Sequence, residues 1–478
     1  MADTAPPFAI DEKTPVPKDG SAHESNTTET DSHDVASSQI DTDLGSKVTR
    51  KIDIALLPLL GMMYLLAFLD RTNIATAKLN GFEADLHMPS SGYNTALWVF
   101  YLPFVLLEVP CNLILGRRGV RPAYWLGGII FILGITSMCQ GLTRSAGGLY
   151  ACRALMGAVE AGVQPGAALL MAQYYRRVEF APRFSFFICC ALIGNTFSAF
   201  LAYAISHMDG VHGLEGWRWI FILEGIVTGC FGIVLGIFTP SWPEKAHFLN
   251  ESEREVLLRR LEIERGKENL DMQNVNWIKC MLNWKTWAIT LVFFCCDMSA
   301  ASTVSFSPTI LSQLGYSGNR ANVMLIPIYL VGAFIMVSSG WIAGRINNRS
   351  GVIAFGAAMS IVGWAIQRAQ VQPAGVRYFG LYMIYWGANI QMPNCVAWFH
   401  SNVVGRPEKA VGMAIIAGFG NSCNFVASNV FITSEAPRYP TAFSTGLAIQ
   451  SLGFVSCLTL AGFFFIQNKK AGTQKYYL

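Results

Sequence analysis

Arg153 and Glu160, two ionisable side chains within one apolar stretch, are spaced for binding an anion together with a proton. They lie in "LYACRALMGAVEAGVQPGAALLMAQYY", seven residues apart. That spacing puts them on one face of a helix, about 10 Å apart along its axis. A buried arginine can hold a carboxylate through two parallel hydrogen bonds, and a buried glutamate can bind and release a proton. A static Arg–Glu network between helices is the structural alternative.

A second acid and base, Asp70 and Arg71, stand side by side in "IDIALLPLLGMMYLLAFLDRTNIATAKL". Apolar residues continue at helical spacing after the pair, which predicts a helix that keeps both charges inside its length. Neighbours on a helix point about 100° apart, so one side chain can face a central cavity while the other faces an adjacent helix. The alternative is a helix that ends at Leu69, with both charges among lipid headgroups.

Amides and aromatic residues gather in two later stretches, "WGANIQMPNCVAWFHSN" and "GFGNSCNFVASN". Gln391 and Trp398 lie in the first and are candidates to contact the polar body of a small organic anion. Amides inside a helix bundle also often join helices to one another, and that alternative stays open.

Three further acids, Glu108, Glu224 and Asp297, also lie in apolar segments of the sequence. A charged side chain inside a membrane is costly and usually functional. For these three we nevertheless expect a structural role, with the carboxyl group bonded to backbone or to a neighbouring helix.

The elements that must position these residues follow from composition. Of the 478 residues, 52% are hydrophobic and only 14% are charged, and the mean hydropathy is +0.37. Soluble domains are about 25% charged, and each membrane helix needs about 20 apolar residues. We therefore predict an all-α polytopic membrane protein. The sequence has no phosphate-binding GxxxxGK[ST] loop, no HExxH pattern and no metal-type CxxC spacing. We expect no enzyme, no cofactor, no metal and no nucleic-acid partner.

Twelve apolar segments divide into two sets of six. They cover about 52–77, 93–115, 123–142, 148–174, 182–206, 217–239, 286–307, 321–344, 351–369, 376–399, 410–431 and 441–466. The expected organisation is a disordered acidic tail (1–46), a first six-helix half (47–239), a central loop with an amphipathic helix (240–285), a second half (286–466) and a short C-terminal tail (467–478). Two six-helix halves are typical of secondary transporters, whose substrate site lies between the halves.

Orientation follows from lysine and arginine in the short connections. One set carries most of them, including Arg117, Arg118, Arg176 and Arg177. The positive-inside rule then puts this set, both termini and the central loop in the cytosol. We expect a multi-pass protein of the plasma membrane that works as a monomer.

Six quoted stretches together resemble one known family. They are "LDRTNI", "PCNLILGRRGVRP", "RALMGAVEAGVQPG", "DGVHGLEGWRWIFILEG", "WPEKAHFLNESER" and "APRY". The chain resembles the anion:cation symporter family of the major facilitator superfamily, in its fungal allantoate- and nicotinate-permease-like branch. The resemblance implies a twelve-helix facilitator fold with alternating access and proton symport of organic anions.

The resemblance also implies residue roles. Asp70 and Glu160 match the proton-coupling acids of sugar-acid relatives, and Arg71 and Arg153 match their substrate-binding arginines. A substrate-contacting asparagine in the second half maps to Asn421.

The chain departs from the superfamily pattern at its inner gate. The gate motif usually has an Asp, whereas "NLILGRRGVR" has Gly116 and "GWIAGRINNR" has Gly344. Fungal relatives have a basic pair after the tenth span and a Gly-rich eleventh helix, but this chain has Glu408-Lys409 and "GNSCN". The usual inner salt bridge and the identity of the substrate body are therefore not implied.

The sequence thus predicts a proton-coupled importer of a small carboxylate. Arg71 and Arg153 would attract the carboxylate, Asp70 and Glu160 would carry protons, and second-half side chains would contact the substrate body. Two alternatives remain: an exporter of an acidic fungal metabolite on the same fold, and a nutrient sensor that binds without transporting.

Overall fold

The computed structural model describes residues 27–115, 120–205, 208–272, 280–316, 318–403, 406–471 and 476–477, and these ranges are helical with short connections. The first half comprises α1 (Thr27–Lys78), α2 (Phe82–Asp85), α3 (Gly92–Leu115), α4 (Pro122–Gly141), α5 (Ala146–Glu160), α6 (Val163–Tyr174), α7 (Arg177–Ile205) and α8 (Gly216–Phe238). The centre holds α9 (Glu251–Met272), and the second half comprises α11 (Trp284–Gln313), α12 (Gly318–Ile346), α13 (Arg349–Ala369), α14 (Ala374–Asn402), α15 (Arg406–Asn421), α16 (Cys423–Asn429) and α17 (Pro440–Ala471). Short 3₁₀ turns lie at Val211–Gly213, Pro243–Lys245 and Thr433–Glu435.

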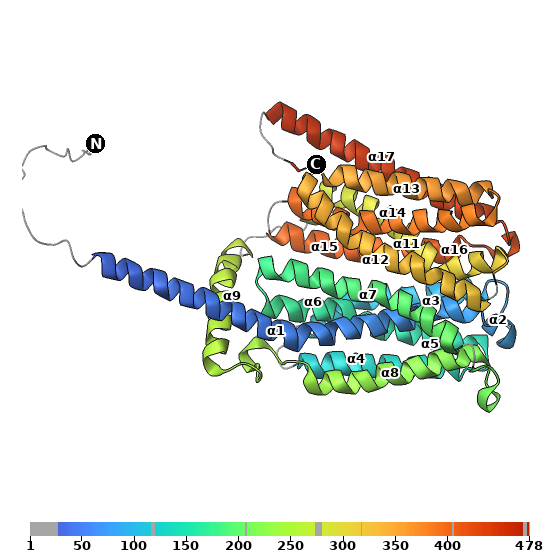
Figure 1. Cartoon of the computed structure of the whole chain (residues 1–478), viewed down its shortest axis with the longest axis horizontal. Coiled ribbons are helices and arrows are strands. Elements are labelled where there is room, and N and C mark those ends of the chain that lie inside the picture. The colour runs from blue at the N-terminus through green and yellow to red at the C-terminus, as the bar shows by residue number, and fades with distance from the viewer. Residues whose placement is uncertain are drawn as a thin grey trace, which may run out of the picture.

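The two halves form two bundles of nearly parallel helices side by side. In Figure 1 the blue and green helices of the first half lie below the yellow-to-red helices of the second. The helix α9 lies across one end of the bundles, and α2 lies at the other end. We call these the α9 end and the α2 end.

Helices cover all twelve segments that the sequence predicts to be apolar spans. In the described part of the chain, ten helical segments are long and apolar enough to cross a membrane. The helices α3 and α14 are not among those ten. In α14 the polar residues Asn389, Gln391 and Asn394 lower the mean hydropathy of the helix. All three are buried.

The start of α1 corrects a predicted boundary. The acidic composition of residues 1–46 predicts disorder, but the structure continues α1 back to Thr27. Extending an existing helix costs far less than nucleating one, so the membrane helix can propagate into polar sequence. Residues 1–26 lie outside the described ranges. At its other end α1 runs on to Lys78, which rules out the alternative of a helix that ends at Leu69.

Glycines let helices of the first half approach closely. A Cβ atom at Gly134 of α4 would overlap the backbone of Gly229 in α8, and one at Gly157 of α5 would overlap the carbonyl oxygen of Phe100 in α3. Small residues serve this purpose in membrane bundles, where helices associate by close packing. The second contact brings α5, the helix of Arg153 and Glu160, against α3.

The halves meet at the α2 end through side-chain hydrogen bonds. The Tyr93 hydroxyl donates to the Ser305 carbonyl at 2.6 Å, and the Asn94 amide donates to the Phe431 carbonyl at 2.7 Å. The ring of Phe431 stacks on that of Phe306, with centroids 4.0 Å apart. These contacts close the seam between the halves at this end.

The central loop holds the helix α9. The Asn250 backbone N–H donates to the Glu253 carboxylate at 3.0 Å, as the capping-box spacing predicts. Leu257 and Leu261 are buried against the first half. The Lys51 ammonium lies 2.6 Å from Glu253. This ammonium, with the Asn250 N–H, holds the pKa of the Glu253 carboxyl below its usual value.

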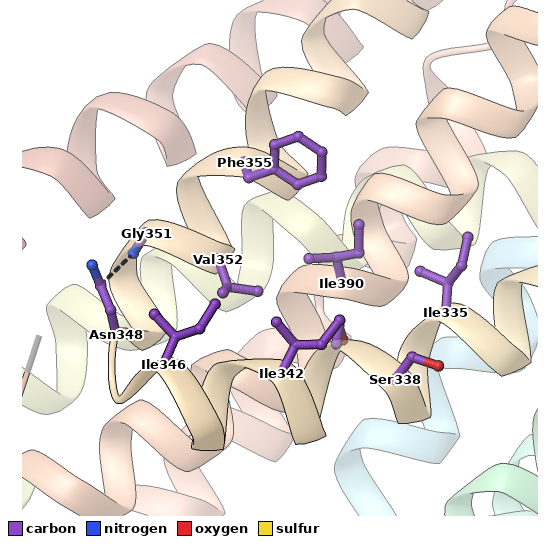
Figure 2. A pocket seen from close by; sticks show the side chains of 10 residues that line it. Ile335, Ser338, Ile342, Ile346, Asn348, Gly351, Val352, Phe355 and Ile390 are labelled. Carbon is purple, nitrogen blue, oxygen red and sulfur yellow. Dashed lines mark hydrogen bonds between the residues drawn. The ribbon is translucent and has the colours of Figure 1, made fainter.

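A groove of about 360 Å³ lies between α12, α13 and α14. Figure 2 shows its apolar lining, with Ile342, Val352 and Ile390 among the side chains. None of the predicted site residues lines it, so the groove is separate from the charged residues.

Candidate functional site

A break between α5 and α6 sets the position of Glu160. The helix α5 ends at Glu160 and α6 begins at Val163. Pro165 in the first turn of α6 has no backbone N–H to donate to the preceding turn, and a proline at such a place breaks or bends a helix. Interrupted membrane helices often build transporter sites. Glu160 therefore ends α5 inside the bundle, with 1% of its surface exposed.

The carboxylate of Glu160 pairs with Arg71. The Arg71 Nη2 lies 2.5 Å from Glu160 Oε1, and Nε donates to the same oxygen at 2.8 Å. The guanidinium also lies over the rings of Phe68 and Phe104, at 4.9 and 4.8 Å from their centroids. The sequence predicted that Arg153 and Glu160 share a face, but α1 supplies the ion-pair partner of Glu160.

Arg153 is held differently. Its side chain is 1% exposed. Its Nη1 donates to the Arg71 carbonyl at 3.3 Å and faces the Met156 sulfur at 3.6 Å. Its Nε and Nη2 have no hydrogen-bond partner in the described part of the chain. A buried charge without such partners is costly, and these N–H groups could donate to an acceptor that the described residues do not supply.

Asp70 faces neighbours other than those of Arg71. It is fully buried, and its Oδ1 accepts a 2.9 Å hydrogen bond from the Ser137 hydroxyl of α4. As expected for successive residues of a helix, the acid and the base face different neighbours. Arg71 faces α3 and α5, whereas Asp70 faces α4 and α8.

The second half contributes Asp297 of α11 near the same region. Its Oδ2 accepts from the Cys423 thiol at 3.1 Å, and its carboxyl group interacts electrostatically with Arg71. Asn421 ends α15 one residue before the break to α16, next to Cys423. Its side chain is half-buried, and its carbonyl accepts from the Asn424 amide at 2.9 Å.

The structure does not bring Gln391 and Trp398 to this region. Gln391 is fully buried and accepts a 3.0 Å hydrogen bond from Gln450 of α17. The indole N–H of Trp398 donates to the Tyr477 carbonyl at 3.0 Å, and its ring packs on Phe464. Both polar groups have partners, because α14 places these side chains inside the second half.

Glu224 is bonded to a neighbouring helix, as the sequence led us to expect. This acid of α8 is 4% exposed and accepts a hydrogen bond from Asn73 of α1. Asn73 lies three residues after Asp70, hence on the same face of α1. That spacing relates Asn73 to Asp70, whereas the contact of Asn73 with Glu224 is visible only in the structure.

These residues form a buried set of opposite charges at the centre of the first half, with Asp297 facing it from the second. Among the described residues, no group of three His, Cys, Asp or Glu side chains is arranged to hold a metal ion. What the arrangement offers is cationic N–H groups for an anion and carboxyl groups for protons.

Comparison with known proteins agrees with this fold. The family model described as "Major Facilitator Superfamily" matches residues 60–459. An uncharacterised transporter of Schizosaccharomyces pombe is 30% identical over 434 residues, covering 89% of this chain and 84% of the relative. A high-affinity nicotinic acid transporter of Saccharomyces cerevisiae is 29% identical over 410 residues, covering 84% and 75%.

A solved structure shares the arrangement of helices. It is a bacterial homologue of the lysosomal transporter Spinster, with a TM-score of 0.63, 17% identity, and coverage of 86% of this chain and 96% of that one. At this identity the similarity shows the fold alone. The family match over most of the chain shows that this protein belongs to the major facilitator superfamily and is a multi-pass membrane transporter, not an enzyme.

Proposed function

We propose that the chain is a proton-coupled symporter of a small organic anion carrying a carboxylate, in the anion:cation symporter branch of the superfamily. The observation that carries the proposal is Arg153, a buried guanidinium with two N–H groups that lack partners in the described residues. A carboxylate would supply two acceptor oxygens for such a fork. The similarity to a nicotinic acid transporter, whose substrate carries a carboxylate, supports this substrate class.

Proton coupling arises because Glu160 and the substrate carboxylate compete for Arg71. Glu160 holds Arg71 in the structure, so a substrate carboxylate must displace an internal one to reach that guanidinium. Protonating Glu160 removes its charge and frees Arg71 for the substrate. Losing the proton lets Glu160 compete again and expel the substrate. Coupling then follows from the different interactions that each ligand makes in the two states.

The proposed site contains Arg71 and Arg153 for the carboxylate, with Asp70 and Glu160 as proton-binding groups. Asn421 stays a candidate for the substrate body because it lies next to the Asp297–Cys423 contact. We leave Gln391 and Trp398 out of the proposed site, because their polar groups already bind within the second half.

In the proposed orientation both termini and the α9 end face the cytosol at the plasma membrane, and the protein works as a monomer. The hydrogen bonds at Tyr93 and Asn94 then close the extracellular side. A conformation closed outside is one of the two states that alternating access requires.

The test is uptake by yeast that express the chain, at acidic external pH, with labelled nicotinate, allantoate, pantothenate, sugar acids and dicarboxylates. Each substrate is offered with and without a protonophore. We expect at least one carboxylate to accumulate, and the protonophore to abolish its accumulation. No uptake of any of them, with the protein verified at the cell surface, would contradict import and favour export of an acidic metabolite.

A further inference from the structure

A second group of buried polar side chains lies on a face of α1 that Arg71 does not share. Asn73 donates to Glu224 Oε2 and accepts a 3.0 Å hydrogen bond from the Ser198 hydroxyl. Asp70 lies one turn earlier on α1 and accepts from Ser137. These contacts join α1, α4, α7 and α8. We call Asp70 and Glu224, with the Asn73 amide beside them, the α1–α8 acid pair.

Several oxygens of this group lack hydrogen-bond partners in the described ranges. They are Asp70 Oδ2, Glu224 Oε1 and Thr228 Oγ1, on side chains that are 0%, 4% and 0% exposed. The Thr228 hydroxyl lies near Asp70 but makes no hydrogen bond of normal geometry. Unmade bonds are costly at this depth. The Thr228 hydroxyl is close enough to Asp70 to donate to it after a small movement, whereas Glu224 Oε1 has no donor among the described residues.

The charges around the pair do not balance it. Asp70 is the charged group that acts electrostatically on Glu224. Around Asp70, α5 contributes Glu160 and Arg153, α4 contributes the Ser137 hydroxyl, and α8 contributes the Thr228 hydroxyl. On α7 the neighbouring group is the Ser198 hydroxyl. Among the described residues neither acid has an ion-pair partner of the kind that Arg71 gives Glu160. Two neighbouring carboxylates without an ion-pair contact cannot both stay charged cheaply.

We propose that Asp70 and Glu224 bind one proton as a pair, so that Glu224 is a second protonatable group of the transport cycle. A shared proton removes one negative charge and supplies the missing donor. This inference rests on the proposed proton symport for its role in transport, although the proton-binding pair itself does not depend on that role.

A proton rather than a metal ion suits the donors already in place. The Asn73 amide and the Ser137 hydroxyl direct hydrogen atoms at the carboxylates. A metal ion would need oxygen acceptors in those positions instead.

The pair also has a polar connection to the seam between the halves. A cavity of about 10 Å³ lies there, lined by Ser198 and Asn195 of α7, Thr72 of α1 and Tyr329 of α12. That volume is close to the space that one water molecule needs. Ser198 bonds to Asn73, and Asn73 bonds to Glu224, so hydrogen bonds link the cavity to the acid. An opening of the seam would thereby reach the pair.

Infrared spectroscopy of the purified, lipid-reconstituted protein tests the pair directly. We expect a neutral-carboxyl C=O band near neutral pH that Glu224→Gln removes or weakens. Asp70→Asn should shift the midpoint at which the remaining Glu224 band titrates. The control Glu215→Gln changes a partly exposed acid bonded to Arg218 and should leave the band unchanged. A band that is identical in wild type and Glu224→Gln would overturn the proposal, and so would an Asp70→Asn variant with an unshifted midpoint.

Transport provides the second readout. Each coupled proton multiplies the accumulation ratio about tenfold per pH unit of gradient. In proteoliposomes with the membrane potential clamped, Glu224→Gln should keep substrate counterflow and lose about that factor in pH-driven accumulation. Unchanged accumulation would contradict the role of Glu224 in the cycle. A wild type whose substrate accumulation does not depend on the pH gradient, yet shows the infrared band, would contradict the proposed symport and leave the acid pair standing.

Discussion

The two halves of the transporter treat buried polar groups differently. In the second half the indole of Trp364 donates to Ser299, Ser299 donates to Gln450, and Gln450 donates to Gln391. This relay joins α13, α11, α17 and α14 through hydrogen bonds of 2.9–3.0 Å. In the first half the charged side chains Arg153, Asp70 and Glu224 keep polar atoms without partners among the described residues, and the second half also has such atoms, for example on Asn322 and Arg377.

What distinguishes the first half from this relay is its cluster of charged groups, Asp70, Arg71, Arg153, Glu160 and Glu224. A polar network whose members are satisfied makes its helices rigid. Polar atoms that lack partners are high in free energy until something binds them. We therefore place anion and proton binding mainly in the first half, and we expect substitutions in the second-half relay to act on stability.

The largest effect is expected from Arg153→Gln. The change removes the charge that would hold the carboxylate, and losing one partner of a buried charged hydrogen bond costs about 2–5 kcal/mol. Uptake should fall by a factor of about 100 or more, with surface expression unchanged. The measurement is initial uptake of labelled substrate per molecule at the cell surface.

Arg144→Gln serves as the matched control, because Arg144 is an exposed arginine in the loop before α5. It should transport like wild type. Normal uptake by Arg153→Gln would place anion binding elsewhere.

The next effect concerns Glu160→Gln, which removes the carboxylate paired with Arg71. Proton-driven accumulation should fall about tenfold per pH unit of gradient, as loss of one coupled proton requires. Counterflow should persist, because an amide leaves Arg71 free for the substrate. The measurement compares accumulation with counterflow in the same proteoliposomes.

Its matched control is again Glu215→Gln, which also changes an acid bonded to an arginine, but at the α2 end and with nearly half of its side chain exposed. We expect accumulation to stay normal in it. If Glu160→Gln still accumulates substrate against the gradient, then the pair with Arg71 is structural.

A smaller effect is expected in the second half. Gln450→Leu breaks the relay and leaves the Gln391 side-chain oxygen without its donor. Thermal unfolding of the purified protein should show a loss of about 1 kcal/mol, with KM unchanged. The exposed Gln372 gives the control Gln372→Leu, which should not shift the melting temperature. A raised KM in Gln450→Leu at normal stability would mean that the relay contacts substrate.

The smallest effect concerns the contact of α9 with α1. The pKa of Glu253 is lowered by Lys51, so its stabilising contribution is present above the unfolded carboxyl pKa of about 4.3. This contribution is lost as the pH falls through the lower folded value. Glu253→Gln should speed hydrogen exchange in α9 at neutral pH, while variant and wild type converge under strongly acidic conditions. Equal exchange rates at neutral pH would show that the ion pair does not hold α9.

Much of the architecture could be predicted, because apolar length alone marks a membrane helix. The twelve segments and the capped helix α9 follow from such local rules. The extension of α1 to Thr27 could not be foreseen, because the polar composition of that segment carries no sign of the helix that continues into it.

Within the site, helical spacing predicted that Asp70 and Arg71 point in different directions, one toward a central cavity and the other toward an adjacent helix. Spacing could not pair residues from different helices. Arg153 and Glu160 share α5, yet the ion pair of Glu160 comes from α1. The same limit hid the contact between Asn73 and Glu224, which are 151 residues apart. It also hid the partners of Gln391 and Trp398.

The measurement that tests the central claim most directly is competition between a carboxylate and its amide in proteoliposomes with an imposed pH gradient. Nicotinate against nicotinamide is one such pair, and the same comparison can be made for any carboxylate that the uptake screen identifies. We predict that the carboxylate competes with the labelled substrate, that its uncharged amide does not, and that Arg153→Gln removes this preference. Equal competition by both compounds would contradict a site built on buried arginines.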